Sequence, residues 1–167
     1  PRIDPADLDV AELRVLDLAP RRHDPAVVVL LVPPREAHEI GVEVGMIGSE
    51  GMVGVSVALG VHTSTVLALV QGSGTALRMD ASAFETEIAR NGALKTQVHR
   101  YVHLLMGQLG QTAACNAFHP IEARCARWLL MTRDRMQSNE LELTQAFLAR
   151  MLGVRRVGVT VAAGNLQ

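Results

Sequence analysis

The most informative stretch of the chain is LTQAFLARMLGVRRVGVTVAAGNLQ, residues 143–167. Thr144 is a strong N-cap for a helix that runs to about Leu152, because its hydroxyl can accept a hydrogen bond from a backbone N–H of the first turn. Gly153 ends this helix, since glycine adopts a positive φ without a steric penalty from Cβ. Ala149 is small where a second helix must cross close to the first. The spacing therefore predicts a helix-turn-helix.

The second helix of this motif begins with basic residues. Arg155 and Arg156 fall at the end that a recognition helix inserts into the major groove, where a guanidinium can bind guanine O6 and N7. Residues 144–167 hold three arginines and no acid. We therefore expect contacts with double-stranded DNA from Thr144, Gln145, Arg155, Arg156, Val157, Thr160 and Val161. The alternative is an ordinary helical hairpin with a basic surface.

The composition is that of a globular protein with one large or two small domains. Of its 167 residues, 49% are hydrophobic and 20% charged, which suffices for a packed core. The apolar runs are far shorter than the roughly 20 residues of a membrane span, and no signal-type leader opens the chain. We therefore expect a cytoplasmic protein with no membrane partner. Aromatic residues make up only 3%, which favours duplex DNA over single-stranded nucleic acid as the partner.

Short β-branched runs alternate with glycines in the middle of the chain, as strands and turns do. Because each such strand buries one face only, they must close against one another. We expect a small antiparallel β-roll, an incomplete jelly roll, with strands over residues 27–32, 42–47, 52–61, 65–71 and 75–79.

The hydrophobic period becomes helical from Ser82 onward. Ser82 and Glu85 form a capping-box pattern that opens a short helix, which Asn91-Gly92 ends. A longer helix follows over residues 93–118, and Pro120 starts another. A short strand is expected over residues 140–143.

Apolar residues recur along the longer helix at steps of three and four. We expect this stripe to be a homodimer seam, with polar residues at its end that set the register of the two helices. The alternative is a helix packed on its own β-roll. The stripe consists of Leu94, Val98, Val102, Leu105, Leu109, Thr112 and Asn116.

Three stretches resemble the Crp/Fnr family of bacterial transcriptional regulators: VEVGMIGSEGMVGVSVALG (42–60), IEARCARWLLMTRDRM (121–136) and ELELTQAFLARMLGVRRVGVT (140–160). The resemblance implies an α+β fold with three parts. These are a cyclic-nucleotide-binding-like β-roll over residues 1–92, a dimerisation helix over 93–118 and a helix-turn-helix domain over 119–167. It also implies a homodimer on a pseudo-palindromic operator, with RNA polymerase as a further candidate partner. The segment before Val42 is atypical and no wing follows the motif, so we expect truncation at both ends.

The effector of this chain differs from that of the cyclic-AMP-binding members. Those members use a glutamate for the ribose and an arginine for the phosphate, where Val55 and Thr63 stand here. No lysine or arginine occurs in residues 36–77, so the phosphate would find no cationic side chain. We expect that cyclic AMP does not bind, and we assign no cofactor. The candidate effector pocket consists of Gly51, Gly54, Val55 and Thr63, where backbone N–H groups could hold a weaker anion.

The recognition helix also differs from that of the cyclic-AMP-binding members. Their three polar base-contacting positions correspond to Arg156, Val157 and Val161, so the resemblance implies a different operator.

No catalytic or metal site is expected. His99 and His103 lie four residues apart, but no third ligand follows at a diagnostic spacing. Cys125 lies on the apolar face of its helix, where a thiolate is disfavoured, and two cysteines cannot hold a cubane iron–sulfur cluster. The protein is therefore predicted not to be an enzyme. Two hypotheses remain: a sequence-specific, homodimeric DNA-binding regulator, or a dimerising sensor or scaffold whose truncated head no longer reads DNA.

Overall fold

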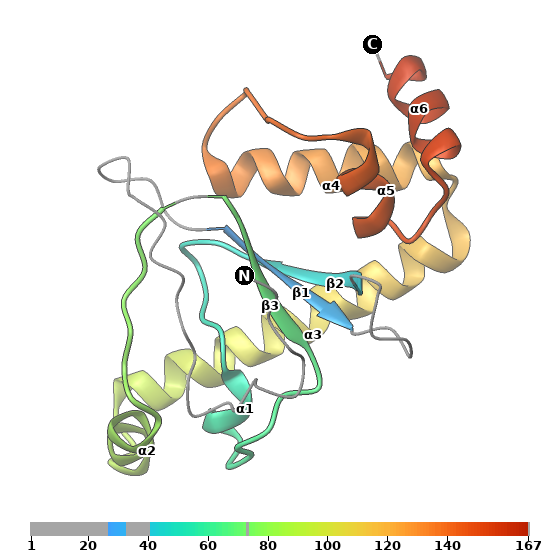
Figure 1. The fold of residues 1–167 in the computed structure, drawn as a ribbon. Helices are drawn as coiled ribbons and strands as arrows, with labels where there is room; N and C mark the ends of the chain where they lie inside the picture. The colour runs from blue at the N-terminus through green and yellow to red at the C-terminus, as the bar shows by residue number, and fades with distance from the viewer. Residues whose placement is uncertain (1–26, 33–40, 73, 167) are drawn as a thin grey trace.

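The computed structural model describes residues 27–32, 41–72 and 74–166 (Figure 1). Residues 1–26, the N-terminal part of the expected β-roll, lie outside this range. The elements in chain order are β1 (Val27–Val32), β2 (Val42–Ile47), α1 (Val55–Ala58), β3 (Leu67–Gly72), α2 (Ala81–Ala89), α3 (Ala93–Phe118), α4 (Ile121–Met136), α5 (Gln145–Met151) and α6 (Arg156–Asn165). They form an α+β fold, as the sequence predicts. We call α4, α5 and α6 together the head.

β1 is the central strand of a three-stranded sheet, with β2 and β3 antiparallel on either side. Its sequence, VVVLLV, is apolar without alternation, and Val29, Leu30 and Leu31 are all buried. Such a continuous run is typical of a strand that is covered on both faces. In Figure 1 the head lies over one face of the sheet and α3 over the other, and the two apolar clusters of the core follow this division.

The strand expected over residues 52–61 is a wrong prediction, because this segment contains helix α1. Gly54 precedes the helix and Gly60 follows it, with positive φ angles of 86° and 76°. The backbone hydrogen bonds are local, from Val57 N to Gly54 O and from Gly60 N to Val57 O. The valines of this segment are typical of a strand, but the glycine turns override that preference.

Two further expected strands, over 75–79 and 140–143, are also absent from the described residues. In the first, Thr75 makes only an isolated bridge, and the side chain of Leu77 is fully exposed. In the second, the Ser138 hydroxyl lies 3.1 Å from Glu140 N and so forms a local turn. Neither segment pairs with the sheet as a strand, although Leu143 packs on the apolar cluster beneath the head.

The short helix expected from Ser82 is α2, but its capping box is not formed. The N-cap is Asp80, and the Ser82 carbonyl accepts a hydrogen bond from the Thr86 hydroxyl. The helix ends before Asn91, whose φ is 55°.

Helix α3 packs closely on β2, one of the two edge strands of the described sheet. The side-chain amide of Gln108 accepts a hydrogen bond from Met46 N at 2.7 Å and donates one to Met46 O at 3.1 Å. It thereby pairs edge backbone groups that a neighbouring strand would otherwise use. Gly45 permits this approach, since a Cβ there would lie 3.0 Å from Gln108 Oε1 and 3.1 Å from the Leu109 side chain.

The apolar stripe of α3 therefore faces the protomer's own core. Val98 and Leu105 are buried, and Leu109 packs on the cluster around Leu105. This matches the alternative interpretation of the stripe, a helix packed on its own sheet. Leu105 packs against Leu30 and Ile47, and Val98 is also buried, so the two side chains have almost no surface left for a second copy. The homodimer seam stays a prediction, and the residues of α3 opposite Leu105, such as Gly107, Gly110 and Ala114, are exposed.

Candidate nucleic-acid interface

The turn between α5 and α6 has the local chemistry that the sequence predicts. Thr144 is the N-cap of α5, and its Oγ1 accepts a hydrogen bond from Phe147 N at 3.1 Å. Gly153 has a φ of 62°, and Val154 N donates to Ala149 O at 2.9 Å across the turn. The chain is thereby redirected from α5 into α6 within four residues, 152–155.

One face of α6 is fixed in the core of the head. Val159 and Ala162 are completely buried, in the same cluster as Trp128 and Leu148. A Cβ on Gly158 would lie 2.9 Å from Ile121 Cδ1, so α6 and α4 are in close contact. Because this face is buried, the remaining residues of α6 are presented outward.

The structure gathers the predicted DNA-contacting residues on this outward surface. All of them are exposed, Val157 to 74% and Val161 to 54%. Positions 156, 157, 160 and 161 share one helix face. Thr160 Oγ1 lies 2.8 Å from Gln145 Oε1, so α5 and α6 contribute jointly to the surface. We define the reading surface as the side chains of Gln145, Arg155, Arg156, Val157, Thr160 and Val161.

The charge of the reading surface is positive and unpaired in the described part of the chain. Neither Arg155 nor Arg156 forms an ion pair with any described residue, and residues 144–166 contain no acid. Both arginines stand at the N-terminus of α6, whose backbone dipole adds positive potential there. Phosphate oxygens are the chemical partners that such an end attracts.

Thr144 has a different role from the rest of the predicted set. It is exposed, but its hydroxyl oxygen already serves as the helix cap. The hydroxyl proton stays available for donation, so Thr144 could still donate a hydrogen bond to a phosphate of the DNA backbone.

One of the candidate effector residues lines a hollow on the surface. A hollow of about 280 Å³ beside the turn after β2 is lined by Gly51, whereas Gly54, Val55 and Thr63 are not among its lining residues. Val55 packs into the core cluster of α3 instead, and Thr63 is exposed. The hollow also receives Arg100 from α3. Arg100 lies far from residues 36–77 in the sequence, so the composition of that segment did not predict this cation.

Sequence reasoning also missed Glu43, a buried acid on β2. It is 6% exposed, and its Oε2 accepts a hydrogen bond from Trp128 Nε1 in the head. Burial raises its pKa from 4.5 to about 7, against the opposing effects of the Trp128 hydrogen bond and the positive charges of Arg127 and Arg135. An acid in the otherwise apolar run VEVGMI was the available signal.

This buried acid makes stability depend on pH. Because the pKa is higher in the folded than in the unfolded chain, the folded state keeps a proton that the unfolded state has lost between about pH 4.5 and 7. The free energy of unfolding that Glu43 contributes is thus fully present below pH 4.5 and is lost as the pH rises through 7, by roughly 3 kcal/mol. In urea unfolding at pH 5 to 8 we expect Glu43→Gln to gain stability over the parent as the pH rises. Parallel profiles would contradict this assignment.

The described residues contain neither a membrane-spanning helix nor a metal-ligand cluster. No helix within 27–32, 41–72 and 74–166 is long and apolar enough to cross a membrane. In the same ranges, no three His, Cys, Asp or Glu side chains come together as ligands.

The geometry of the head is that of a helix-turn-helix domain, and comparison with known proteins specifies the type. Residues 123–167 match the family model described as the Crp-like helix-turn-helix domain. The fold resembles that of a protein assigned to the Crp/Fnr family of transcriptional regulators from Eubacterium rectale ATCC 33656, with a TM-score of 0.59 and 15% identity over 86% of this chain and 73% of that one.

A second similar structure is CLP, the c-di-GMP-responsive global regulator that links cell–cell signaling to virulence gene expression in Xanthomonas campestris. Its TM-score is 0.59, with 14% identity over 87% of this chain and 81% of CLP. Among curated proteins, no sequence matches the chain. The chain thus has a Crp-like helix-turn-helix domain and the fold of Crp/Fnr regulators, and the resemblance to that family is confirmed.

Proposed function

We propose that the protein is a sequence-specific, DNA-binding regulator of transcription that acts as a homodimer and places α6 of each protomer in a major groove. The observation that carries the proposal is the reading surface, which is exposed and basic and lies on a Crp-like helix-turn-helix. Double-stranded DNA is the partner, RNA polymerase is a second one, and the cytoplasm is the expected location. No step of this function requires catalysis.

Each side chain of the reading surface suits one kind of contact. The guanidinium of Arg156 can bind guanine O6 and N7, and the amide of Gln145 can bind adenine N6 and N7. The hydrogen bond from Thr160 restricts the orientation of that amide before DNA arrives, which lowers the entropic cost of binding. Val157 and Val161 offer methyl groups to thymine, and Arg155, the residue that precedes α6, suits a phosphate.

The dimer forms, in this proposal, through the face of α3 that points away from its own sheet. Residues opposite Leu105 on the helix are exposed and mostly small: His103, Gly107, Gly110 and Ala114. A Cβ added to Gly107 or Gly110 would meet no atom of the protomer within 4 Å, so packing inside the chain does not explain these glycines. Each costs about 1 kcal/mol of helix propensity relative to alanine, a cost that close approach of a second helix offsets.

Exposed apolar side chains flank this small-residue face and provide area to bury. Leu104 is 68% exposed, Met106 66% and Phe118 83%. A second copy of α3 could bury part of this apolar surface, which would contribute to the stability of the dimer. Among the residues proposed from the sequence, Val98 and Leu105 are buried and Leu109 packs on the cluster around Leu105. Leu94, Val102 and Thr112 lie on the same side of α3 as Leu105, and so outside this seam.

The effector is proposed not to be cyclic AMP. Residues 41–72, which include the turn around α1, offer no lysine or arginine to a phosphate, and the cation that lines the hollow at Gly51, Arg100, comes from α3. The solved relative CLP responds to a different nucleotide, c-di-GMP, so the fold itself does not require cyclic AMP.

Fluorescence anisotropy tests the function with the full chain and two duplexes at several salt concentrations. One duplex is enriched by the protein from a randomised pool, and the other is random. We expect a preference of about a thousandfold or more for the enriched duplex, as specific binders show. Equal, weak binding that vanishes with salt would reduce the interaction to phosphate neutralisation. It would favour the alternative, a dimerising sensor or scaffold.

A further inference from the structure

The head meets the sheet along one face of α4. The contacting residues of α4 are four and three positions apart, so they lie in a row on the helix. They contact β2 and the turn that follows it through three side-chain pairs: Trp128 with Glu43, Thr132 with Met46 at 3.8 Å, and Arg135 with Glu50 at 2.8 Å.

A β-bulge makes this row possible. Leu30 pairs with Gly45 and Leu31 with Glu43, so Val44 is an extra residue on β2. Side chains alternate across a strand, and residues 43 and 46 would ordinarily point to opposite faces. The extra residue brings Glu43 and Met46 to the same face, toward α4. The bulge at Val44 thus places the acidic side chain of Glu43 in the otherwise apolar contact between β2 and α4.

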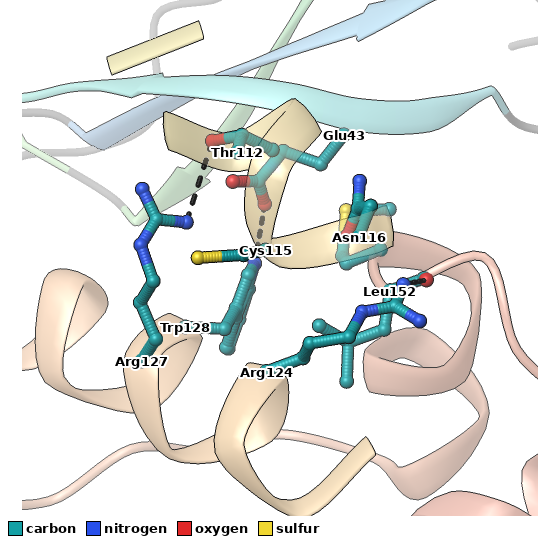
Figure 2. Close-up of a pocket in the computed structure, with 9 residues that line it drawn as sticks. Glu43, Thr112, Cys115, Asn116, Arg124, Arg127, Trp128 and Leu152 are labelled. Atoms are coloured by element: carbon teal, nitrogen blue, oxygen red, sulfur yellow. Dashed lines mark hydrogen bonds between the residues drawn. The ribbon is translucent and has the colours of Figure 1, made fainter. Parts of the chain in front are cut away.

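Glu43 has one direct partner in the described structure, the indole N–H of Trp128. Figure 2 shows the carboxyl group between α3 and α4, above Trp128 and near the guanidinium of Arg127. Arg127 itself donates to the Thr112 hydroxyl at 3.3 Å rather than to the carboxyl group. A buried carboxylate that accepts only one hydrogen bond is costly to keep charged, so protonation of Glu43 should change the strength of its contact with Trp128.

The other groups around Glu43 that can carry charge are few. Beside Arg127, they are Arg124 of α4 and the thiol of Cys115 of α3, which line the same cavity of about 20 Å³, and Arg135 further along α4. The cavity has room for about one water molecule.

The junction extends from Glu43 to the reading surface. Arg124 Nη2 donates to the carbonyl oxygen of Leu152, the first residue of the turn of the helix-turn-helix. At the turn, a Cβ on Gly153 would lie 3.2 Å from the side chain of Val42, the neighbour of Glu43 on β2. Movement of β2 relative to α4 would therefore displace this turn, and with it the start of α6.

We propose that the Glu43–Trp128 contact is the joint that positions the reading surface on the sheet, and that Glu43 is a positioning residue for DNA recognition. The role of this contact in DNA recognition rests on the proposed function. The contact between sheet and head can be tested without DNA. A homodimer must present two recognition helices at one spacing, so a loosened joint weakens specific binding while the phosphate contacts persist.

Intrinsic fluorescence tests the joint without DNA, because Trp128 is the single tryptophan of the chain. We expect its emission to titrate with a midpoint near pH 7 in the parent and to stay flat in Glu43→Gln over the same range. Glu140→Gln, which removes an exposed acid of the loop between α4 and α5, should titrate as the parent does. A titration that persists in Glu43→Gln would refute the joint.

Anisotropy with the enriched and random duplexes tests the positioning role. Trp128→Phe removes the indole N–H and retains an aromatic ring against Phe147, which it meets edge-on. We expect it to lower the preference for the enriched duplex at least tenfold without changing affinity for the random one. Glu43→Gln keeps an oxygen that accepts from Trp128, so its preference should be partly retained and no longer vary with pH.

A core variant separates positioning from stability. Leu105→Ala opens a cavity between α3 and the sheet, away from the joint, and should cost about 2 to 5 kcal/mol of stability while leaving the preference unchanged. The proposal is overturned if Trp128→Phe keeps the parent's preference, or if Leu105→Ala loses it equally. If the parent itself shows no preference, the proposed function fails. The joint is then tested by the fluorescence titration alone and by hydrogen exchange, which we expect to be faster in α5 and α6 of Trp128→Phe than in the parent.

Discussion

Replacing Arg155 and Arg156 together with alanine is expected to lower affinity for the enriched duplex by roughly 100-fold or more, while the chain stays folded and dimeric. A bidentate arginine–guanine contact discriminates by about 1–3 kcal/mol, and a lost phosphate contact adds to this uniformly across sequences. Both side chains are exposed and unpaired among the described residues, so their removal costs no packing. Anisotropy measures the affinity, and circular dichroism verifies the fold.

The control for this variant removes the same charge elsewhere. Arg78→Ala with Arg90→Ala also eliminates two positive charges, on exposed residues around α2 rather than in the head. We expect this pair to retain specific affinity nearly in full, because long-range attraction is screened at physiological salt. The reading-surface variant should also show a smaller dependence of affinity on salt, since fewer counterions are released. If both double variants bound the enriched duplex as tightly as the parent, the reading surface would be wrongly assigned.

The head was predictable because its signals are local. Thr144 caps α5 through a residue only three positions away, and Gly153 takes the positive φ that its place in the turn requires. Val159 and Ala162 follow the helical period, and both are buried. Each of these features depends on near neighbours in the sequence, so a sequence pattern contains them.

The sheet and its junction were less predictable because their causes are distant in sequence. Residues 52–61 have the valines of a strand, but Gly54 and Gly60 turn the chain around α1. Glu43 and Trp128 are 85 positions apart, and no periodicity connects them. The apolar stripe of α3 was ambiguous in a different way. The same spacing serves a helix that packs on its own sheet and a helix that packs on its copy. Only the folded structure, in which Leu105 is buried, separates the two.

The second large effect concerns the dimer. Ala114→Glu is expected to convert the protein from a dimer to a monomer of 18.0 kDa, as measured by sedimentation equilibrium. Ala114 is exposed at the centre of the small-residue face of α3, so in a symmetric dimer the two glutamates would lie close together. Their mutual repulsion and their bulk oppose the close approach that Gly107 and Gly110 permit.

Ala113→Glu is the matched control, because it makes the same change one residue earlier on the same helix. Consecutive residues are about 100° apart around a helix, so Ala113 lies outside the centre of the proposed seam, and it is also exposed. We expect this variant to remain dimeric and to bind the enriched duplex as the parent does. Ala114→Glu should keep its helical content yet lose most of the specific affinity, because two half-sites are then bound independently rather than together. The assignment of this face of α3 to the dimer would be contradicted if the parent sedimented as a monomer. It would also be contradicted if Ala114→Glu dimerised as strongly as the parent.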